Sequence, residues 1–273
     1  MQPILSTHLF VNQQLHPGLL EMAARAGADG VEIFAARQHF DYTSREHVEQ
    51  VAEWFRSNAL KPFSMHAPMF PDREMGRGGA PAVNLIHPEK ARRIDAMDEV
   101  KRALESAEKI PFRYLVVHLG EKTDGWSQRT VEFAITALEH LGAFASPLGV
   151  RLLVENLTSE ATTPEHLALI IELGHLPQVG ICLDLGHAHM TTGIAAAIQA
   201  VGPQVESIHV HDNKGFRDEH LWPGDGNIDW QSTMLALHRL PKDPALVLEI
   251  HYNLGDEFLS IPGKVEQAFA KLR

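Results

Sequence analysis

The stretch from residue 180 to residue 187, Gly-Ile-Cys-Leu-Asp-Leu-Gly-His, decides the fold. It begins as a short apolar run, ends that run in the carboxylate of Asp184, and passes at once into a turn. A run that is apolar at consecutive rather than alternate positions is typical of a parallel strand buried on both faces. We therefore interpret residues 180–184 as a buried strand with a polar side chain at its carboxyl end.

Seven further runs of the same kind occur along the chain, each followed by turn residues and a longer stretch with helical periodicity. They cover residues 4–6, 30–34, 63–66, 114–118, 152–155, 207–211 and 246–250. Residues 43–46 and 162–165 have the T-x-x-E form of a capping box, which predicts a helix start at each. The clearest helix covers residues 88–109, with an apolar stripe of Ile94, Met97, Val100, Ala103, Leu104 and Ala107 opposite a charged face.

Eight strand and helix alternations within 273 residues have the size and period of a closed (β/α)₈ TIM barrel of the α/β class. The chain has no Pro-rich or Gly/Ser-rich linker, so we expect a single domain over residues 1–273. Two connections, 67–87 and 212–229, are unusually long. Both would lie at the carboxyl face of the barrel, where active sites of this fold are built.

Composition limits the classes of partner. The chain is 44% hydrophobic and 22% charged, with a formal net charge of -11, which excludes a general electrostatic attraction to nucleic acid or anionic lipid. The single cysteine, Cys182, excludes an internal disulfide and a thiolate-rich metal site, and we expect it to pack. No apolar run is long enough to span a bilayer and no signal peptide is recognisable, so we expect a cytoplasmic protein without membrane contact.

The ends of six consecutive predicted strands carry ionisable side chains. These are His66, His118, Glu155, Asp184, His209 or His211, and Glu249. Because the strand ends of a barrel converge, several carboxylates would meet there and repel one another unless a cation held them. A ligand set of imidazole and carboxylate without thiolate suits a divalent ion. Zn, Mn, Co and Fe are all compatible with it.

Three residues of the following turns extend this set. His187 lies three residues after Asp184, although Asp184 could instead act as a helix N-cap. Asp218 and His220 form a D-x-H pair in the second long connection, and could either reach a cation or be solvated loop residues. Residues 207–211 place His209 and His211 on one face of a strand, and at most one of them need bind metal.

Four motifs together resemble the xylose isomerase-like TIM barrel superfamily. They are Val-Glu-Ile-Phe at 31–34, Val-Glu-Asn at 154–156, Asp-Leu-Gly-His at 184–187, and the run from His209 to Trp230 that contains Asp-Glu-His and Gly-Asp-Gly-Asn-Ile-Asp-Trp. The resemblance spans essentially the whole chain. This superfamily contains sugar isomerases, sugar epimerases and the endonuclease IV type of abasic-site nuclease, so the fold does not choose the reaction.

The resemblance implies two alternative ligand sets. In the epimerase branch one ion is held by residues that match Glu155, Asp184, His209 and Glu249, and the two glutamates also move protons. The nuclease branch has a cluster of three zinc ions. Its ligands match His66, His118 and a bridging Glu155 for one ion, Asp184, His209, Glu249 and Glu155 for a second, and His187, Asp218 and His220 for a third. One to three divalent ions are therefore implied.

We expect a metal-dependent sugar or sugar phosphate isomerase or epimerase with Glu155 and Glu249 as proton-transfer residues. A small-molecule carbohydrate would be its substrate, with His187, Lys214 and Arg217 as binding candidates. The alternative is a zinc phosphodiesterase acting at abasic sites in DNA. Neither long connection is net basic, as a duplex-binding rim would be, so nucleic acid is disfavoured but stays open. A third class is a metal-binding barrel without catalysis.

Overall fold

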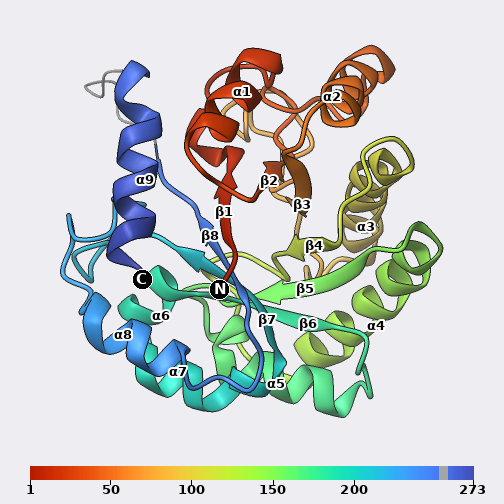
Figure 1. Cartoon of the computed structure of the whole chain (residues 1–273). Coiled ribbons are helices and arrows are strands. Elements are labelled where there is room, and N and C mark those ends of the chain that lie inside the picture. Colours follow the sequence, from red (N-terminus) through yellow and green to blue (C-terminus); the bar gives the residue numbers. More distant parts are fainter. Residues whose placement is uncertain (252–257) are drawn as a thin grey trace.

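Eight parallel strands close into a barrel in which each strand pairs with the next and β8 pairs with β1 (Figure 1). The computed structural model describes residues 1–251 and 258–273. The strands are β1 Pro3–Ser6, β2 Gly30–Phe34, β3 Lys61–His66, β4 Tyr114–Val117, β5 Arg151–Glu155, β6 Gly180–Asp184, β7 Val205–Val210 and β8 Ala245–Leu248. All eight predicted strands are present, which confirms the (β/α)₈ architecture.

Helices surround the barrel, and α9 lies beside α1 so that the outer ring closes (Figure 1). They are α1 Pro17–Arg25, α2 Arg45–Ser57, α3 Lys90–Leu104, α4 Gln128–Ala145, α5 Pro164–Leu173, α6 Leu185–Met190, α7 Ile194–Val201, α8 Trp230–Leu237 and α9 Ile261–Lys271. Within residues 1–251 and 258–273, none of the helices is both long and apolar enough to cross a membrane.

The two predicted capping boxes are each displaced by one residue. Ser44 caps α2, and its hydroxyl accepts a hydrogen bond from the backbone N–H of His47. Thr163 caps α5 in the same way. The threonine before each cap uses its hydroxyl elsewhere: Thr43 donates to Asp41 at 2.6 Å, and Thr162 bonds the Ser159 hydroxyl at 2.7 Å. Each threonine therefore stabilises the preceding turn instead of the helix.

Helix α3 begins later and ends earlier than predicted, and tightens into a 3₁₀ turn at Glu105–Glu108. The prediction that Ile94 belongs to its buried stripe is wrong, because 42% of that residue is exposed. Glu99 is buried instead, since its carboxylate accepts a hydrogen bond from the Tyr42 hydroxyl at 2.5 Å and pairs with Arg102. A paired carboxylate can occupy a buried position that hydropathy alone assigns to an apolar residue.

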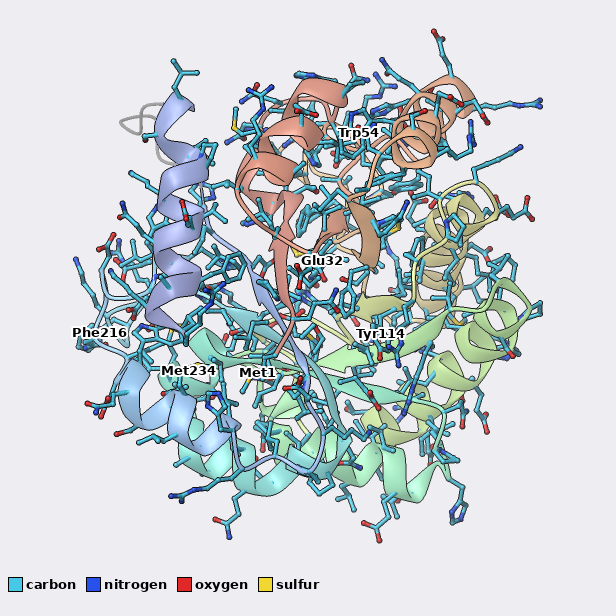
Figure 2. The ribbon with its side chains drawn as sticks, in the orientation of Figure 1. Met1, Glu32, Trp54, Tyr114, Phe216 and Met234 are labelled. Atoms are coloured by element: carbon cyan, nitrogen blue, oxygen red, sulfur yellow. The ribbon has the colours of Figure 1, made fainter. Side chains whose placement is uncertain are left out.

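Side chains inside the barrel change from apolar to polar along the strands. The layer toward the amino ends is apolar and comprises Tyr114, Val116, Leu153 and Cys182 in one cluster and Ile4, Ala245 and Val247 in another. Because inward positions recur every second residue, Glu155 follows Leu153 and Glu249 follows Val247 into the interior. Figure 2 shows Glu32 near the centre of the barrel, whereas Phe216 lies at the periphery. The polar layer therefore rests on an apolar floor.

The long connection after β7 is fixed by the buried carboxylate of Asp212. It accepts hydrogen bonds from the backbone N–H groups of Asn213, Gly224 and Ile228 at 2.9, 2.8 and 3.2 Å, and from the indole N–H of Trp230 at 2.8 Å. These donors are spread over the loop and the first residue of α8. One side chain therefore holds both ends of the connection that carries the predicted D-x-H pair.

Replacing Asp212 by Ala should lower the free energy of unfolding by about 2–5 kcal/mol, because several donors would lose their acceptor at once. Denaturant titration of the metal-free protein measures this. Asp225→Ala is the matched control, since Asp225 lies in the same loop with an exposed side chain. Equal stability of the two variants would contradict the assigned role of Asp212.

Candidate metal centre

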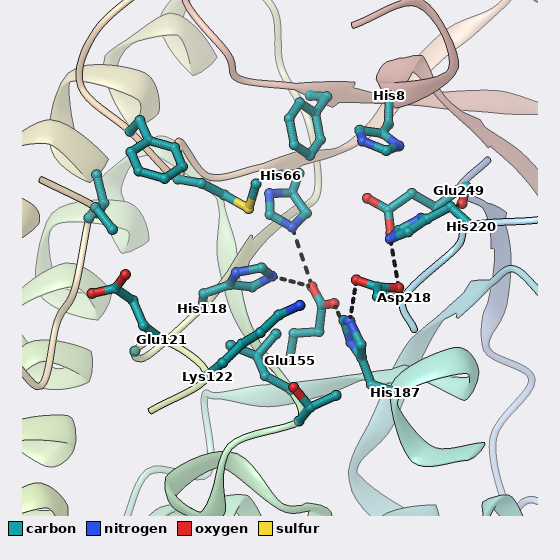
Figure 3. Close-up of a pocket in the computed structure, with 18 of the residues that line it drawn as sticks. His8, His66, His118, Glu121, Lys122, Glu155, His187, Asp218, His220 and Glu249 are labelled. Atoms are coloured by element: carbon teal, nitrogen blue, oxygen red, sulfur yellow. Dashed lines mark hydrogen bonds and ion pairs between the residues drawn. The ribbon is translucent and has the colours of Figure 1, made fainter. Parts of the chain in front are cut away.

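The carboxyl ends of the strands surround a cavity of about 460 Å³ whose walls carry many of the predicted site residues (Figure 3). Glu155 and Asp184 are the last residues of β5 and β6, and Glu249 follows β8 by one residue. The register of β6 and β7 places Asp184 directly beside His209. Ligand atoms of Glu155, Asp184, His209 and Glu249 all lie within 4.8 Å of one another, and all four residues are buried.

His209 lies at the centre of this group with its two ring nitrogens in different surroundings. Nδ1 lies 3.4 Å from Glu155 Oε2, 3.3 Å from Glu249 Oε2 and 3.9 Å from Asp184 Oδ2. Nε2 lies 3.3 Å from Glu32 Oε2, which also accepts a hydrogen bond from the Ser64 hydroxyl at 2.9 Å. Within the described residues Nδ1 is buried without a hydrogen-bond partner. Glu32 therefore orients the ring and leaves Nδ1 facing three carboxylates.

A second group adjoins the first through Glu155. His66 Nε2 lies 3.4 Å and His118 Nε2 lies 3.2 Å from Glu155 Oε2. His66 ends β3, and His118 follows β4 by one residue. The structure thus brings together the three residues that the resemblance assigns to one ion, and Glu155 lies between that group and the group around His209.

A third group lies on the other side of the cavity and comprises His187, His211, Asp218 and His220. Asp218 lies 3.1 Å from both His187 Nε2 and His220 Nε2. His211 stacks on His220 with ring centroids 3.9 Å apart, and its Nε2 lies 3.1 Å from Asp184. Asp218 and His220, the D-x-H pair, therefore belong to a ligand-type group and are not merely solvated loop residues. His209 and His211 both point into the site.

Asp184 combines the two roles that its sequence left open. Its Oδ1 accepts a hydrogen bond from the backbone N–H of His187 at 2.6 Å, as the N-cap of α6. Its Oδ2 faces His211 and His209. Asn156 fixes the adjacent strand ends, because its side-chain amide donates to Asp184 O and accepts from Asp184 N at 2.9 and 2.8 Å.

Three histidines share an arrangement that suits a metal ligand. Nδ1 faces a backbone carbonyl in His66, His187 and His220, at 2.9, 3.0 and 2.8 Å respectively. Because a carbonyl only accepts, Nδ1 carries a proton in each ring and Nε2 is directed at a carboxylate. Second hydrogen bonds of this kind hold metal-binding imidazoles in their tautomer and orientation. With nitrogen and oxygen donors and no thiolate, the residues fit one to three divalent ions.

His187 and His220 of the third group are protonated in the metal-free protein. Although burial lowers the pKa of His187, Asp184 and Asp218 raise it to about 10. Burial likewise opposes the charge on His220, but Asp218 and Glu249 raise its pKa to about 9. Imidazolium groups thus neutralise carboxylates where a divalent ion would otherwise do so.

The glutamates of the first group stay ionised. Burial raises the pKa of both Glu155 and Glu249, but the surrounding histidines together outweigh it and hold each pKa well below its usual value. They are His209 and His118 for Glu155, and His209, His220 and His8 for Glu249. Both side chains are therefore carboxylates at neutral pH. Ionised carboxylates can bind a cation and can also accept a proton.

Sequence reasoning missed three residues of the site. Glu32 was noted only within a motif, and it contacts His209 from 177 positions away. His211 was considered only as an alternative to His209, because at most one of the two was expected to bind metal. His8, after β1, lines the cavity and belongs to a ligand-type group with His220 and Glu249. The available signal for His8 was its place just after β1, and that for Glu32 was a carboxylate within the apolar run of β2. The six-strand pattern left out both strands.

Two predicted substrate-binding residues lie outside the cavity lining. Lys214 and Arg217 are exposed, whereas His187 lines the cavity. The aromatic residue nearest to them, Phe216, is 90% exposed. Substrate contacts by Lys214 and Arg217 stay a prediction. Lys122, which sequence reasoning did not single out, lines the cavity instead.

Residues 20–273 match the model of a family described as xylose isomerase-like TIM barrel, and the chain belongs to this family. An inosose isomerase of Bacillus velezensis is 24% identical over 242 residues, which cover 85% of this chain and 81% of that protein. A probable endonuclease 4 of Natronomonas pharaonis is 29% identical over 221 residues, or 70% of this chain and 78% of that protein. The family resemblance is therefore confirmed, with relatives in both expected branches.

An uncharacterized protein of Methanocaldococcus jannaschii is 28% identical over 172 residues, but this chain spans only 58% of its length. Solved structures share the fold over the whole chain. D-psicose 3-epimerase with D-tagatose from Clostridium cellulolyticum H10 has a TM-score of 0.80 at 16% identity, covering 100% of this chain and 98% of that one. An IOLI protein with a binding zinc atom has a TM-score of 0.76 at 21% identity, covering 100% and 95%.

Metal binding near pH 8 should release protons. At that pH His187 and His220 are protonated in the metal-free protein, and a ring nitrogen must lose its proton before it binds metal. Their raised pKa values stabilise the folded metal-free protein fully below the ordinary value of 6.5, and this stabilisation is lost as the pH rises through 9 to 10. Because His209 also has a raised pKa, zinc titration calorimetry in two buffers of different ionisation enthalpy should report about one to three protons released per chain.

The release should fall above about pH 10, where the rings of His187 and His220 are already neutral. His140→Gln is the control, because His140 is exposed on α4 and should leave the release unchanged. A binding enthalpy that is the same in both buffers at pH 8 would refute the expectation.

Proposed function

We propose that this protein is a divalent-metal-dependent isomerase or epimerase of a keto sugar or keto sugar phosphate. The observation that carries the proposal is the placement of Glu155 and Glu249. Both lie within 3.4 Å of His209 Nδ1, from strands β5 and β8, and both line one cavity. The volume of about 460 Å³ is within the range of small-molecule sites.

Glu155, Asp184, His209 and Glu249 would hold the ion. A divalent ion there supplies Lewis acidity toward a carbonyl oxygen, which acidifies the neighbouring C–H. One glutamate carboxylate would take the proton from that carbon. For isomerisation the same glutamate would return this proton to the adjacent carbon. For epimerisation the other glutamate would first take up a proton from a substrate hydroxyl or from water and would then deliver it to the opposite face. His187 would keep its Nδ1–H on Asn156 O and would turn its Nε2–H from Asp218 to a substrate oxygen.

A relative and a structural neighbour support this choice. The Bacillus protein is an inosose isomerase, and the Clostridium structure is an epimerase with a bound sugar. The cavity lining also favours a small substrate, because Phe34, Met69, Phe70, Val83 and Leu157 bring apolar surface to it. A sugar presents apolar C–H faces as well as hydroxyls, and such a mixed lining suits both.

Phosphodiester hydrolysis at abasic sites is a second candidate, favoured by the third ligand-type group around Asp218. That group adjoins the other two as a trinuclear site would require. The sequence similarity to the probable endonuclease 4 of Natronomonas pharaonis supports this second candidate. Hydrolysis would need a duplex-binding rim, and the exposed cations Lys214 and Arg217 share their loop with Asp225 and Glu219. We therefore place it second.

Glu155→Gln and Glu249→Gln should each reduce kcat for the keto sugar by about 10²- to 10⁴-fold, because an amide cannot move the proton. Initial rates with metal-loaded protein measure the loss, and circular dichroism checks the fold. Glu139→Gln on α4 is the matched control, since Glu139 is exposed on the outer surface. Wild-type turnover in both site variants would rule out the mechanism.

Duplex DNA with a tetrahydrofuran abasic analogue should remain uncut by the zinc-loaded protein under conditions that convert the sugar. A gel assay for nicked strands, with and without chelator, tests this expectation. Metal-dependent nicking at the analogue, without nicking of an intact duplex, would reverse the ranking of the two candidates. Asp218→Asn should then abolish the cleavage, since it would remove the carboxylate of the third group.

A further inference from the structure

One wall of the cavity differs in chemistry from the part that carries the carboxylates. It is built by the loops that follow β4 and β5, and it contributes Lys122, Thr123 and Thr158 to the lining. Among the described residues that line the cavity, Lys122 is the only lysine or arginine. Figure 3 shows its amine turned toward the centre of the cavity. The wall therefore presents an ammonium group and two hydroxyls.

The loop that carries Lys122 is held in place by Asp124. The carboxylate of Asp124 accepts hydrogen bonds from the backbone N–H of Glu121 at 2.6 Å and from the side-chain amide of Asn84 at 2.8 Å. Its backbone carbonyl accepts from Ala161 N at 3.2 Å, which ties the β4 loop to the β5 loop. The position of Lys122 is therefore fixed by contacts that do not involve its own side chain.

Lys122 makes no ion pair with any carboxylate that the structure describes. The carboxylate of Asp124 is occupied by its two donors. Glu121 lines the cavity too, but Figure 3 shows its carboxylate and the Lys122 amine pointing in different directions. Once a divalent ion neutralises the carboxylates across the cavity, this wall retains an uncompensated positive charge. Such a charge attracts an anion more strongly than a neutral hydroxyl group.

We propose that Lys122 is a specificity-determining residue that binds an anionic group of the substrate, phosphate or carboxylate. This anionic group would be at the end of the keto sugar remote from the carbonyl. The carbonyl itself would lie at the ion held by His209 and the neighbouring carboxylates. Thr123 and Thr158 add hydroxyl donors to the same anion. The inference rests on the proposed function and names its substrate class, an anionic keto sugar. An ammonium suits either anion because it acts as a point charge.

Calorimetric binding to metal-loaded protein tests this with D-fructose, D-fructose 6-phosphate and 5-keto-D-gluconate. One of the two anionic ligands should bind at least about 10-fold more tightly than D-fructose. Lys122→Gln should weaken the binding of that ligand by about 10- to 100-fold, because the variant removes the charge-assisted contact. The affinity for D-fructose should stay unchanged. Lys122→Arg should keep part of the preference. The ligand that responds identifies the anion as phosphate or carboxylate.

Lys61→Gln is the matched control. It makes the same charge change at the first residue of β3, at the opposite end of the barrel, and should not alter any of the three affinities. A preference for the anionic ligand that survives Lys122→Gln overturns the inference. Equal weakening of D-fructose overturns it as well, and so does the absence of tighter binding by either anionic ligand.

The binding readout separates this inference from the proposed function. Turnover of D-fructose with no anionic preference would overturn the role of Lys122 alone. An anionic preference that depends on Lys122, in a protein that neither isomerises nor epimerises the bound ligand, would overturn the proposed reaction alone.

Discussion

Repulsion between buried carboxylates is the constraint on which the rest of this site depends. Glu32, Glu155, Asp184 and Glu249 are almost inaccessible to solvent, and a buried carboxylate needs a counter-charge. His209 lies among them and supplies part of it. His187 and His220 carry protons in the metal-free protein and would lose them to solvent when a metal ion binds. Protonation, metal content and stability are therefore one coupled property of this chain.

Much of the fold and of the ligand set could be predicted because both depend on local patterns. Apolar runs gave the eight strands, and the closure of parallel strands into a barrel made their carboxyl ends converge. The two-residue period then directed Glu155 and Asp184 inward after apolar residues of the same strands. Element boundaries were less predictable. Thr43 and Thr162 had the form of helix caps, and only their contacts with the preceding turns displace each helix by one residue.

Contacts between distant strands could not be predicted, because they depend on register and stagger that no local pattern encodes. Glu32 on β2 reaches His209 on β7 across the interior. The stacking of His211 on His220 depends on how the loop after β7 folds back, and Asp212 fixes that loop through donors up to eighteen positions away. Lys122 is exposed and belongs to no sequence motif that would have pointed to it. Its place became apparent only with the cavity wall.

Glu155 is shared by two candidate ion sites, and this would make their metal affinities thermodynamically linked. It belongs to the group with His66 and His118 and to the group with Asp184 and His209. An ion in one group changes the charge that Glu155 offers to the other, so the affinities of the two groups depend on each other reciprocally. The number of ions on the chain is then set by the free metal concentration as well as by the residues. A proposed mononuclear site and a proposed multinuclear site would thus draw on the same residues of this chain.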